Sequence, residues 1–205
     1  MIIDINILLA WGAVYKKLGR GEVIFSEGSE CSYYNQLVSG IVKWVNIDDD
    51  GKEYIQTMIE PGECFGELPM LDGGAHIATL SLTEGARLSC LAPEDVADLR
   101  RTRPEFDTAL TLSVCNTLRT LFAIHLAKLS LQPEALLLYR LENFCSRLRM
   151  GEEDEIEIPI SQEEFARMLG FSRRTMVDAL AKLQNRKLIR RSYGSIHVKA
   201  SGFVT

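Results

Sequence analysis

The 205-residue chain lacks several features that would place it at once in a class of protein. It has no run of about 18 apolar residues, which a membrane-spanning helix would need. Its N-terminus, MIIDINILLAWG, is apolar, but it carries Asp4 and has no basic start, which does not fit a secretory signal. We therefore expect a cytoplasmic protein that has no membrane partner.

Metal ligands and catalytic groups are scarce and scattered. The five cysteines form neither a CxxC pair nor a zinc-ligand pattern, which fits reduced thiols in a cytoplasm. Among the three histidines, His76 has no second histidine near it in the first half of the chain. This argues against a cupin-type enzyme, which needs a His/Glu metal set on neighbouring strands. No nucleophile–base set is present either, so we expect no catalytic residues, no metal site, no cofactor and no enzyme activity.

The chain is acidic overall, but its excess of positive charge is concentrated at one end. The formal net charge is −5. From residue 161 onward there are nine Lys or Arg against three Asp or Glu, a net charge of +6, so the preceding residues carry −11. A basic segment on an acidic body favours contact with nucleic acid through that segment alone, with solvated surface charge as the alternative.

The first half of the chain has the pattern of β structure. Asp50-Gly51, between two strand-like runs, predicts a hairpin because both residues can take positive φ. Many short strands with regular turns predict a barrel or roll, and the later helices make the fold class α+β. Five runs are rich in Val, Ile, Thr and aromatic residues: GEVIFSEGS, QLVSGIVKWVNI, KEYIQTMI, AHIATLSL and ARLSCL.

Two prolines mark a change to helical structure. Pro93, followed by Glu and Asp, suits the first turn of a helix, and Pro104 opens a second one. From Pro104 to Lys128 apolar residues recur at threes and fours, which predicts a helix roughly 37 Å long at about 1.5 Å per residue. It is apolar on more than one face. We expect one face to cover the β structure and another to meet a second copy of the chain, with burial inside one subunit as the alternative. The residues assigned to the dimer contact are Leu110, Val114, Leu118, Leu121 and His125.

A helical pair, SQEEFARMLGFSRRTMVDALAKLQNRKLI, begins at residue 161. Ser161 and Glu164 have the spacing of a capping box. Gly170 suits the tight turn of a helix-turn-helix, and Ser172 suits the cap of the second helix. The inner face of that second helix is assigned to Met176, Val177, Leu180 and Leu183.

The outer face of the second helix is charged. Arg173 and Arg174 lie in its first turn, the part of a recognition helix that meets base edges in a major groove. Arg suits guanine O6 and N7, and Lys suits phosphates. The following LIRRSYGSIHV predicts a basic hairpin beside the DNA backbone. The residues assigned to double-stranded DNA are Ser161, Gln162, Ser172, Arg173, Arg174, Thr175, Asp178, Lys182, Arg190 and Arg191.

The order of β domain, long helix and winged helix-turn-helix resembles the CRP/FNR superfamily of bacterial transcription regulators. The stretches GRGEVIFSEGS, GECFGELPML and ISQEEFARMLGFSRRTMVDALAKLQNRKLI carry the resemblance. It implies a cyclic-nucleotide-binding-like β-roll at 1–103, a dimerisation helix at 104–131 and a winged helix-turn-helix domain at 132–205. It also implies a homodimer that binds a palindromic promoter site and that contacts RNA polymerase.

The resemblance extends to the residues that read bases in this superfamily. Arg173 matches the cyclic-AMP-receptor branch at its position. Arg174 and Asp178 match neither that branch nor the FNR branch. We therefore expect a half-site that differs from those of both branches.

The cradle for a cyclic nucleotide departs from the family pattern. Cyclic-AMP binders follow a Gly-Glu-Leu with an Arg-Ser pair that grips the phosphate. This chain has His76 and Ile77 at those two positions. Ile cannot donate a hydrogen bond and His is mostly neutral at pH 7, so affinity should fall roughly a hundredfold or more.

Two residues of the long helix point the same way, because Leu121 and Phe122 stand where cyclic-AMP binders carry the Thr and Ser that touch adenine. We expect a degenerate effector pocket. Its assigned residues are Gly66, Glu67, Leu68, His76, Ile77, Leu121 and Phe122.

Several interpretations of the sensor remain open. It binds a different, unidentified small molecule, it has lost ligand control, or it holds a metal centre. An iron–sulfur cluster of the FNR type needs clustered N-terminal cysteines, and only Cys31 lies near that end. Haem with His76 or His125 as axial ligand is a further alternative. A rival from another class is a nucleotide-binding regulatory subunit that does not bind DNA.

Overall fold

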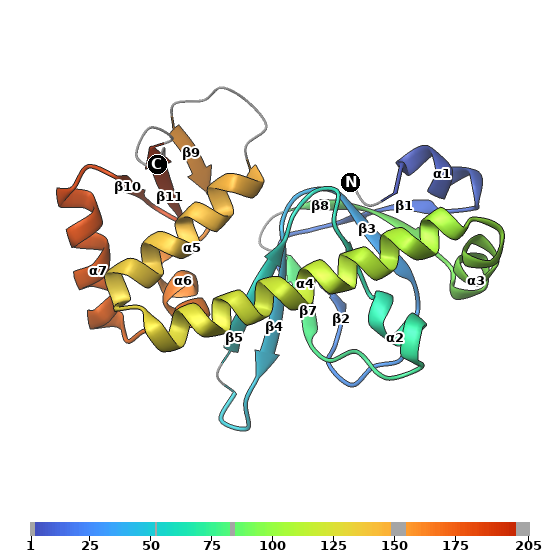
Figure 1. Cartoon of the computed structure of the whole chain (residues 1–205), viewed down its shortest axis with the longest axis horizontal. Coiled ribbons are helices and arrows are strands. Elements are labelled where there is room, and N and C mark those ends of the chain that lie inside the picture. The colour runs from blue at the N-terminus through green and yellow to red at the C-terminus, as the bar shows by residue number, and fades with distance from the viewer. Residues whose placement is uncertain (1–2, 52, 83–84, 149–154, 200–205) are drawn as a thin grey trace. The chain divides into compact units, whose positions relative to one another are not determined.

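The computed structural model describes residues 3–51, 53–82, 85–148 and 155–199 (Figure 1). The chain divides into two compact units, residues 1–119 and 120–205. The boundary falls inside helix α4 (Pro104–Ser130), which matches the long helix expected from Pro104 onward. This helix is therefore shared by the two units, whereas the sequence separates it as a segment of its own.

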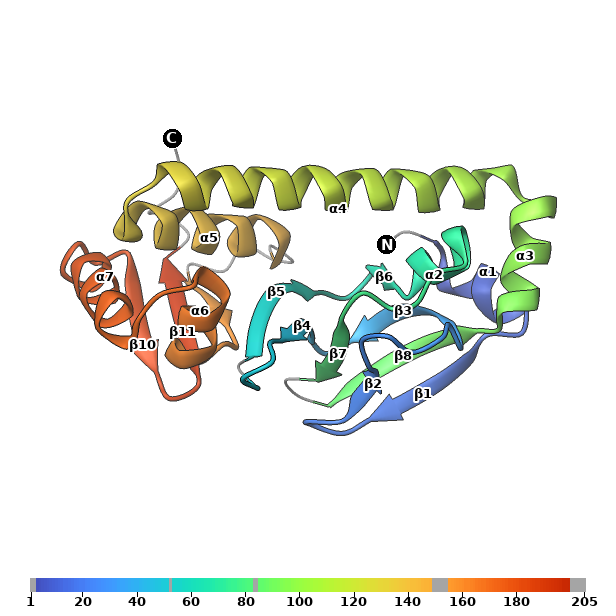
Figure 2. The same ribbon diagram turned by 90° about the horizontal axis from the view of Figure 1, so that it is seen from below.

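The first unit contains two four-stranded antiparallel sheets, which confirms the β-rich first half (Figure 2). Side chains from both sheets, among them Leu37, Val42, Phe65 and Leu80, form one apolar core. Burial of such side chains drives the two sheets together. The sheet orders are β1 (Val14–Leu18), β8 (Ala86–Leu91), β3 (Tyr34–Ser39), β6 (Cys64–Phe65), and β2 (Val23–Phe25), β7 (Thr79–Leu82), β4 (Val42–Ile47), β5 (Glu53–Ile59).

Turns divide these strands more finely than the sequence predicts. The run QLVSGIVKWVNI forms two strands because Gly40, with φ of 94°, turns the chain between them. A Cβ at Gly40 would lie 2.7 Å from the Cβ of Ala86, so only glycine fits this close approach. The hairpin at Asp50-Gly51 joins β4 to β5 as predicted, and the Gly51 amide donates to the Asp48 carbonyl at 2.9 Å.

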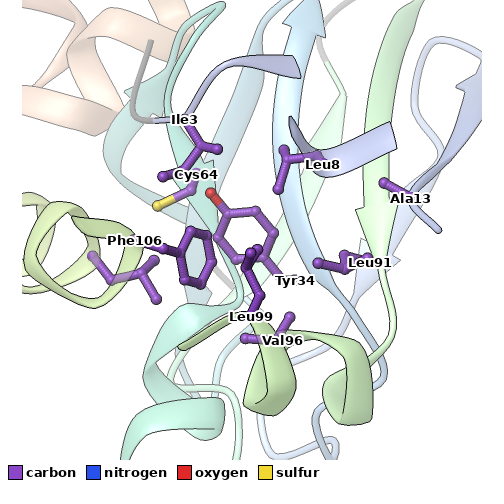
Figure 3. Close-up of a cluster of buried hydrophobic side chains, with 10 residues drawn as sticks. Ile3, Leu8, Ala13, Tyr34, Cys64, Leu91, Val96, Leu99 and Phe106 are labelled. Atoms are coloured by element: carbon purple, nitrogen blue, oxygen red, sulfur yellow. The ribbon is translucent and has the colours of Figure 1, made fainter. Parts of the chain in front are cut away.

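A second core of the first unit lies between the β1–β8–β3–β6 sheet and three helices (Figure 3). The helices are α1 (Ile5–Ala10), α3 (Pro93–Thr102) and the first part of α4. The ring of Phe106 from α4 meets the edge of Tyr34, with centroids 5.8 Å apart. Leu110, one turn further along α4, is also buried in this cluster. Its assignment to the dimer contact is wrong, because its side chain is already enclosed by its own subunit.

The second unit begins in α4 and continues with α5 (Pro133–Leu148). Its strands form a sheet in the order β10 (Ile189–Ser192), β11 (Ser195–Lys199), β9 (Glu155–Ile158). Helices α6 (Gln162–Leu169) and α7 (Arg173–Asn185) complete it. Phe144 of α5 packs on the edge of Phe165 of α6, with ring centroids 6.0 Å apart. The β10–β11 hairpin confirms the predicted wing, and Gly194 turns it with φ of 77°.

Candidate functional site

Helix α6 begins with the capping box that the sequence predicts. The Ser161 hydroxyl accepts a hydrogen bond from the Glu164 amide at 3.2 Å, and the Glu164 carboxylate accepts one from the Ser161 amide at 3.0 Å. The helix ends at Gly170, whose left-handed backbone, with φ of 73°, turns the chain away from the helix. Gln162, the first residue of α6, is half-buried. Local hydrogen bonds thus fix the start and the turn of the helix pair.

Helix α7 is capped by the hydroxyl of Ser172, which the sequence assigns to DNA together with Thr175. Ser172 Oγ accepts a hydrogen bond from the Thr175 amide at 3.1 Å. It also lies 2.8 Å from Thr175 Oγ1. These contacts start the helix immediately before Arg173 and Arg174, so both arginines fall in the first turn. Their guanidinium groups are exposed beside the free amides of a helix N-terminus.

The two faces of α7 differ from the predicted ones at one residue. Met176, Leu180 and Leu183 are buried as expected, and Ala179 joins them. Val177 was assigned to the same inner face, but 45% of its surface is exposed. It lies on the outer face with Asp178, because the buried stripe is centred on the other side of Leu180. The assignment of Val177 to the core is therefore wrong.

A groove with a volume of about 460 Å³ runs along this outer side of the helix pair. Its apolar lining includes Phe171, Met176 and Val177. Its polar lining consists of Gln162, Arg173 and the ion pair of Arg167 with Glu163. The groove is formed by α6, the turn at Phe171 and the first two turns of α7. It therefore places apolar and cationic groups side by side on one surface.

The wing arginines are held by neighbours in their own unit. Arg190 forms a bidentate ion pair with Glu155 of β9, with Nη2–Oε2 at 2.8 Å and Nε–Oε1 at 3.4 Å. The Arg190 hydrogen bond holds the pKa of Glu155 below its ordinary value. Arg191 Nε donates to Gln184 Oε1 at 2.6 Å. Both arginines remain on the surface, but their guanidinium groups already have partners.

The ion pairing of the α7 cations differs between the two ends of the helix. Lys182 Nζ lies 3.8 Å from the carboxylate of Glu134 on α5. By contrast, Arg173 and Arg174 form no ion pair with any residue in the described part of the chain. The first turn of α7 thus presents two exposed cations that form no ion pair with the described residues.

In the first unit, the cradle segment contains a short helix. Helix α2 (Glu67–Asp72) lies between Gly66 and Gly73, which both have left-handed backbones. A Cβ at Gly66 would lie 3.0 Å from the carbonyl oxygen of Tyr33, so this position requires glycine. Leu68 lines a small cavity next to this glycine.

His76 is packed as a core side chain. Only 5% of its surface is exposed, and its ring stacks on Phe25 with centroids 3.5 Å apart. Burial lowers the pKa of His76 below its ordinary value. Backbone hydrogen bonds to Gly28 and Ser29 fix the chain at this residue. No feature of the sequence signals the stacking, because Phe25 is 51 residues away.

Ile77 takes the opposite orientation, with 57% of its surface exposed. Its carbonyl oxygen accepts a hydrogen bond from Asn46 Nδ2 at 2.8 Å. Asn46 also donates to the Glu27 carboxylate at 3.1 Å, so it links two loops at the cradle. Asn46 therefore supports the cradle from outside its cavity, a role that the sequence does not signal.

The cavity of the cradle has a volume of about 20 Å³. A cavity of this size holds about one water molecule. Its lining is mainly apolar and includes Phe25, Trp44, Phe65 and Leu80. Glu67 adds a buried carboxyl group, and burial raises the pKa of Glu67 to about 7. The cavity of the cradle is therefore small and largely apolar.

The remaining assigned residues lie along α4. Val114 is half-buried, and Leu118, Leu121 and His125 are exposed. Phe122 is exposed as well, and neither it nor Leu121 is among the residues that line the cradle cavity. The assignment of these two residues to an effector pocket stays a prediction.

Two further properties concern membrane spans and metal sites. By length and composition alone, α4 could cross a membrane, although the sequence has no continuous apolar run of that length. This is weak support for a membrane span, because helices of soluble proteins pass the same test. No group of three or more His, Cys, Asp or Glu suited to a metal ion occurs among residues 3–51, 53–82, 85–148 and 155–199.

Comparison with known proteins relates both units to one family. Residues 15–103 match the cyclic nucleotide-binding domain, and residues 135–200 match the Crp-like helix-turn-helix domain. The CRP-like cAMP-activated global transcriptional regulator of Mycobacterium tuberculosis is 25% identical over 184 residues, which cover 89% of this chain and 82% of that protein. The cyclic AMP receptor protein of Thermus thermophilus is 26% identical over 190 residues, 90% of this chain and 83% of that protein.

A solved structure supports the same fold. FixK2 from Bradyrhizobium japonicum has a TM-score of 0.82 with 19% identity, and the match covers 92% of each chain. The capped helix pair, the wing and the β-roll described above are the parts that these matches share. The chain therefore belongs to the CRP/FNR superfamily and is a DNA-binding transcriptional regulator with a cyclic nucleotide-binding domain and a Crp-like helix-turn-helix domain.

Proposed function

We propose that the chain acts as a homodimer on a palindromic promoter site and that α7 enters the major groove. The observation that carries this proposal is the pair of exposed arginines, Arg173 and Arg174, in the first turn of α7. The start of a recognition helix is the part that meets base edges. A guanidinium group suits the O6 and N7 atoms of guanine. Asp178, one turn further, faces the same side and accepts from cytosine N4.

The other assigned residues position the protein on the duplex. Gln162 at the start of α6 and the hydroxyls of Ser161, Ser172 and Thr175 lie at helix N-termini, where backbone amides favour phosphate oxygens. Lys182, Arg190 and Arg191 add positive charge beside the DNA backbone. Because these three side chains have intramolecular partners, we expect them to contribute less than Arg173 and Arg174.

Dimerisation is proposed through the exposed apolar face of α4. Val114, Leu118, Leu121 and His125 recur at intervals of four, three and four residues, which places them on one stripe of the helix. Exposed leucines in such a stripe are the usual contact of a two-stranded helical interface. A dimer places two copies of α7 on the two halves of a palindrome, since the symmetry of the site mirrors that of the protein.

The sensor is proposed to have lost the side chains that bind the phosphate of cyclic AMP. Its relatives from Mycobacterium tuberculosis and Thermus thermophilus are named for cyclic AMP. In this chain a neutral, stacked His76 and an outward-facing Ile77 replace a cation and a hydroxyl. The cavity of about 20 Å³ is much smaller than a nucleotide. An effector of this protein is therefore a different small molecule that opens the apolar cradle, or the regulator works without one.

Haem does not fit the same cradle. The His76 ring is covered by Phe25 on one face, and the adjoining cavity holds about one water molecule. His125 lies on the exposed side of α4. We propose a cytoplasmic regulator without cofactor or catalytic activity that contacts RNA polymerase at its promoters, as transcriptional regulators of its kind do.

Selection of DNA from a randomised duplex library by the purified chain tests this function. We expect a palindromic sequence to emerge and to bind in gel-shift assays, with an affinity that falls steeply as salt rises. A scrambled duplex of the same composition is the control. If no sequence is enriched and no salt-sensitive binding is seen, the chain is better described as a regulatory subunit that does not bind DNA.

A further inference from the structure

An apolar side chain lies in the middle of the charged face of α7. Val177 follows Arg173 by four residues and Arg174 by three, so all three lie on adjacent turns of one face. Its exposed fraction of 45% is far above that of the core residues on the opposite face. Ala181, four residues further along, is half-buried and extends the apolar surface by one turn.

This surface has a shape that suits a small apolar group. Val177 forms part of the groove of about 460 Å³ between α6 and α7, together with Phe171 and Met176. Arg173 and Gln162 line the same groove with polar atoms. A partner that fits here must combine hydrogen-bond acceptors for the guanidinium group with an apolar group for Val177.

The major groove of DNA offers one apolar group, the C5-methyl of thymine. The O6 and N7 acceptors of a guanine suit Arg173, and the methyl group of a neighbouring thymine suits Val177. We infer that Val177 contacts a thymine methyl in each half-site and that it thereby selects T·A at a base pair next to those read by the arginines. This inference rests on the proposed DNA-binding function and adds a base-selecting residue that is neither charged nor polar.

A methyl group can be removed from the DNA without changing its hydrogen bonds. Uracil pairs with adenine as thymine does and lacks only the C5-methyl. The test uses a palindromic duplex that the full-length chain has enriched. A series of duplexes is made, and in each one a single thymine position of the half-site carries uracil. The substitution is made at the equivalent position of both half-sites. At one position the affinity of the wild-type protein should fall about fourfold per half-site, or about fifteenfold for the duplex, the effect of one buried methyl.

The matching protein variant is Val177→Ala, which shortens the side chain and keeps a good helix former. It should bind the thymine and uracil duplexes with equal affinity at that position. Val23→Ala in β2 is the control, because Val23 has a similar exposed fraction of 53% and lies outside the helix-turn-helix. The control should keep the wild-type preference for thymine. Circular dichroism of both variants verifies that their folds are intact.

Three results would overturn the inference. One is a Val177→Ala variant that keeps the full thymine preference at every position, while the wild-type protein still selects its site. Another is a wild-type protein that shows no methyl dependence at any position, or an enriched half-site without thymine. In these cases the proposed function stands and only the role of Val177 fails. If no sequence is enriched at all, the proposed function fails and this inference fails with it.

Discussion

The imidazole ring of His76 lies flat on the phenyl ring of Phe25, with centroids 3.5 Å apart and planes 11° apart. A Cβ on Gly66 would lie 3.6 Å from His76 Cε1, so the histidine also packs against the start of α2. The ring is thus enclosed between a strand residue and the cradle backbone. Because burial lowers the pKa of His76, it is neutral at pH 7 and gives no charge for a phosphate.

Cyclic AMP should not bind the wild-type protein at concentrations up to about millimolar. The cradle lacks a cation and a hydroxyl, and the His76 ring occupies part of the space beside Gly66. Isothermal titration calorimetry should show no heat of binding, and thermal unfolding should show no shift. Binding in the micromolar range by the wild-type protein would contradict the interpretation of His76 and Ile77.

The double variant His76→Arg, Ile77→Ser is the matched test of the same cradle. It restores the two side chains that grip the phosphate in cyclic-AMP binders and removes the ring that stacks on Phe25. We expect it to bind cyclic AMP more tightly than the wild-type protein does. AMP, which lacks the cyclic phosphate, serves as the control ligand for both proteins.

Glu67→Gln should stabilise the protein above neutral pH. The folded-state pKa of Glu67 is about 7, above its ordinary value of 4.5, because burial disfavours the carboxylate. Its favourable contribution is therefore fully present below about pH 4.5 and is lost as the pH rises through 7. The glutamine variant cannot ionise, so its free energy of unfolding should exceed that of the wild type by about 3 kcal/mol at pH 8.

Urea denaturation of both proteins at a series of pH values from 4 to 8 measures this difference. The difference should be smallest near the acid end and should reach a plateau above pH 7. Glu22→Gln, at an exposed glutamate in the same unit, is the control and should show no such rise. A Glu67→Gln effect that does not change with pH would mean that folding does not raise the pKa of Glu67.

Local signals made the second unit the more predictable part of the fold. The capping box of Ser161 and Glu164, the left-handed Gly170 and the Ser172 cap are all set by residues within a few positions of each other. In the first unit, the sequence does not signal helix α2, because it is only six residues long and lies between two left-handed glycines without a side-chain cap. The need for glycine at Gly40 comes from Ala86, which is distant in the sequence and close in space.

Side-chain environments were predicted less well than elements. Val177 fits a helical spacing with Leu180, so the sequence placed it in the core, whereas the buried stripe is centred on Met176, Ala179 and Leu183. Leu110 has the spacing of the exposed stripe on α4, but the packing of α1, α3 and β3 encloses it. In both cases the periodicity of apolar residues predicts the buried face of the helix only to within one residue. Tertiary contacts then decide which side chains at the edge of that face are buried.

Leu118→Glu should disrupt the proposed dimer. Leu118 is exposed on α4 in the stripe with Val114 and Leu121, so a charge there would be buried at the interface without a partner. Light scattering should give the mass of a monomer for this variant and that of a dimer for the wild type. An intact dimer would place the interface elsewhere.

Leu112→Glu is the control for this prediction. Leu112 lies on the same helix and has nearly the same exposed fraction as Leu118, 55% against 53%. It points to a different side, because six residues on an α-helix correspond to a rotation of about 240°. The control should therefore remain a dimer, and a monomer in both variants would indicate loss of the helix itself.

Arg173→Ala should reduce sequence discrimination more than it reduces general affinity for DNA. Its guanidinium is exposed in the first turn of α7 and forms no ion pair in the described part of the chain, so it is free to meet a base edge. Loss of such a contact should weaken binding to the preferred duplex by about 1–3 kcal/mol, roughly 5- to 150-fold. Binding to a scrambled duplex should change much less.

Arg190→Ala provides the comparison, because Arg190 is already paired with Glu155 and lies in the wing. A contact from the wing to phosphates carries no sequence information, so this variant should lose affinity for the preferred and scrambled duplexes alike. Fluorescence anisotropy with both duplexes at several salt concentrations separates the two effects. If Arg173→Ala keeps the wild-type ratio of affinities for the two duplexes, Arg173 contacts the backbone and base reading must come from other residues of α7.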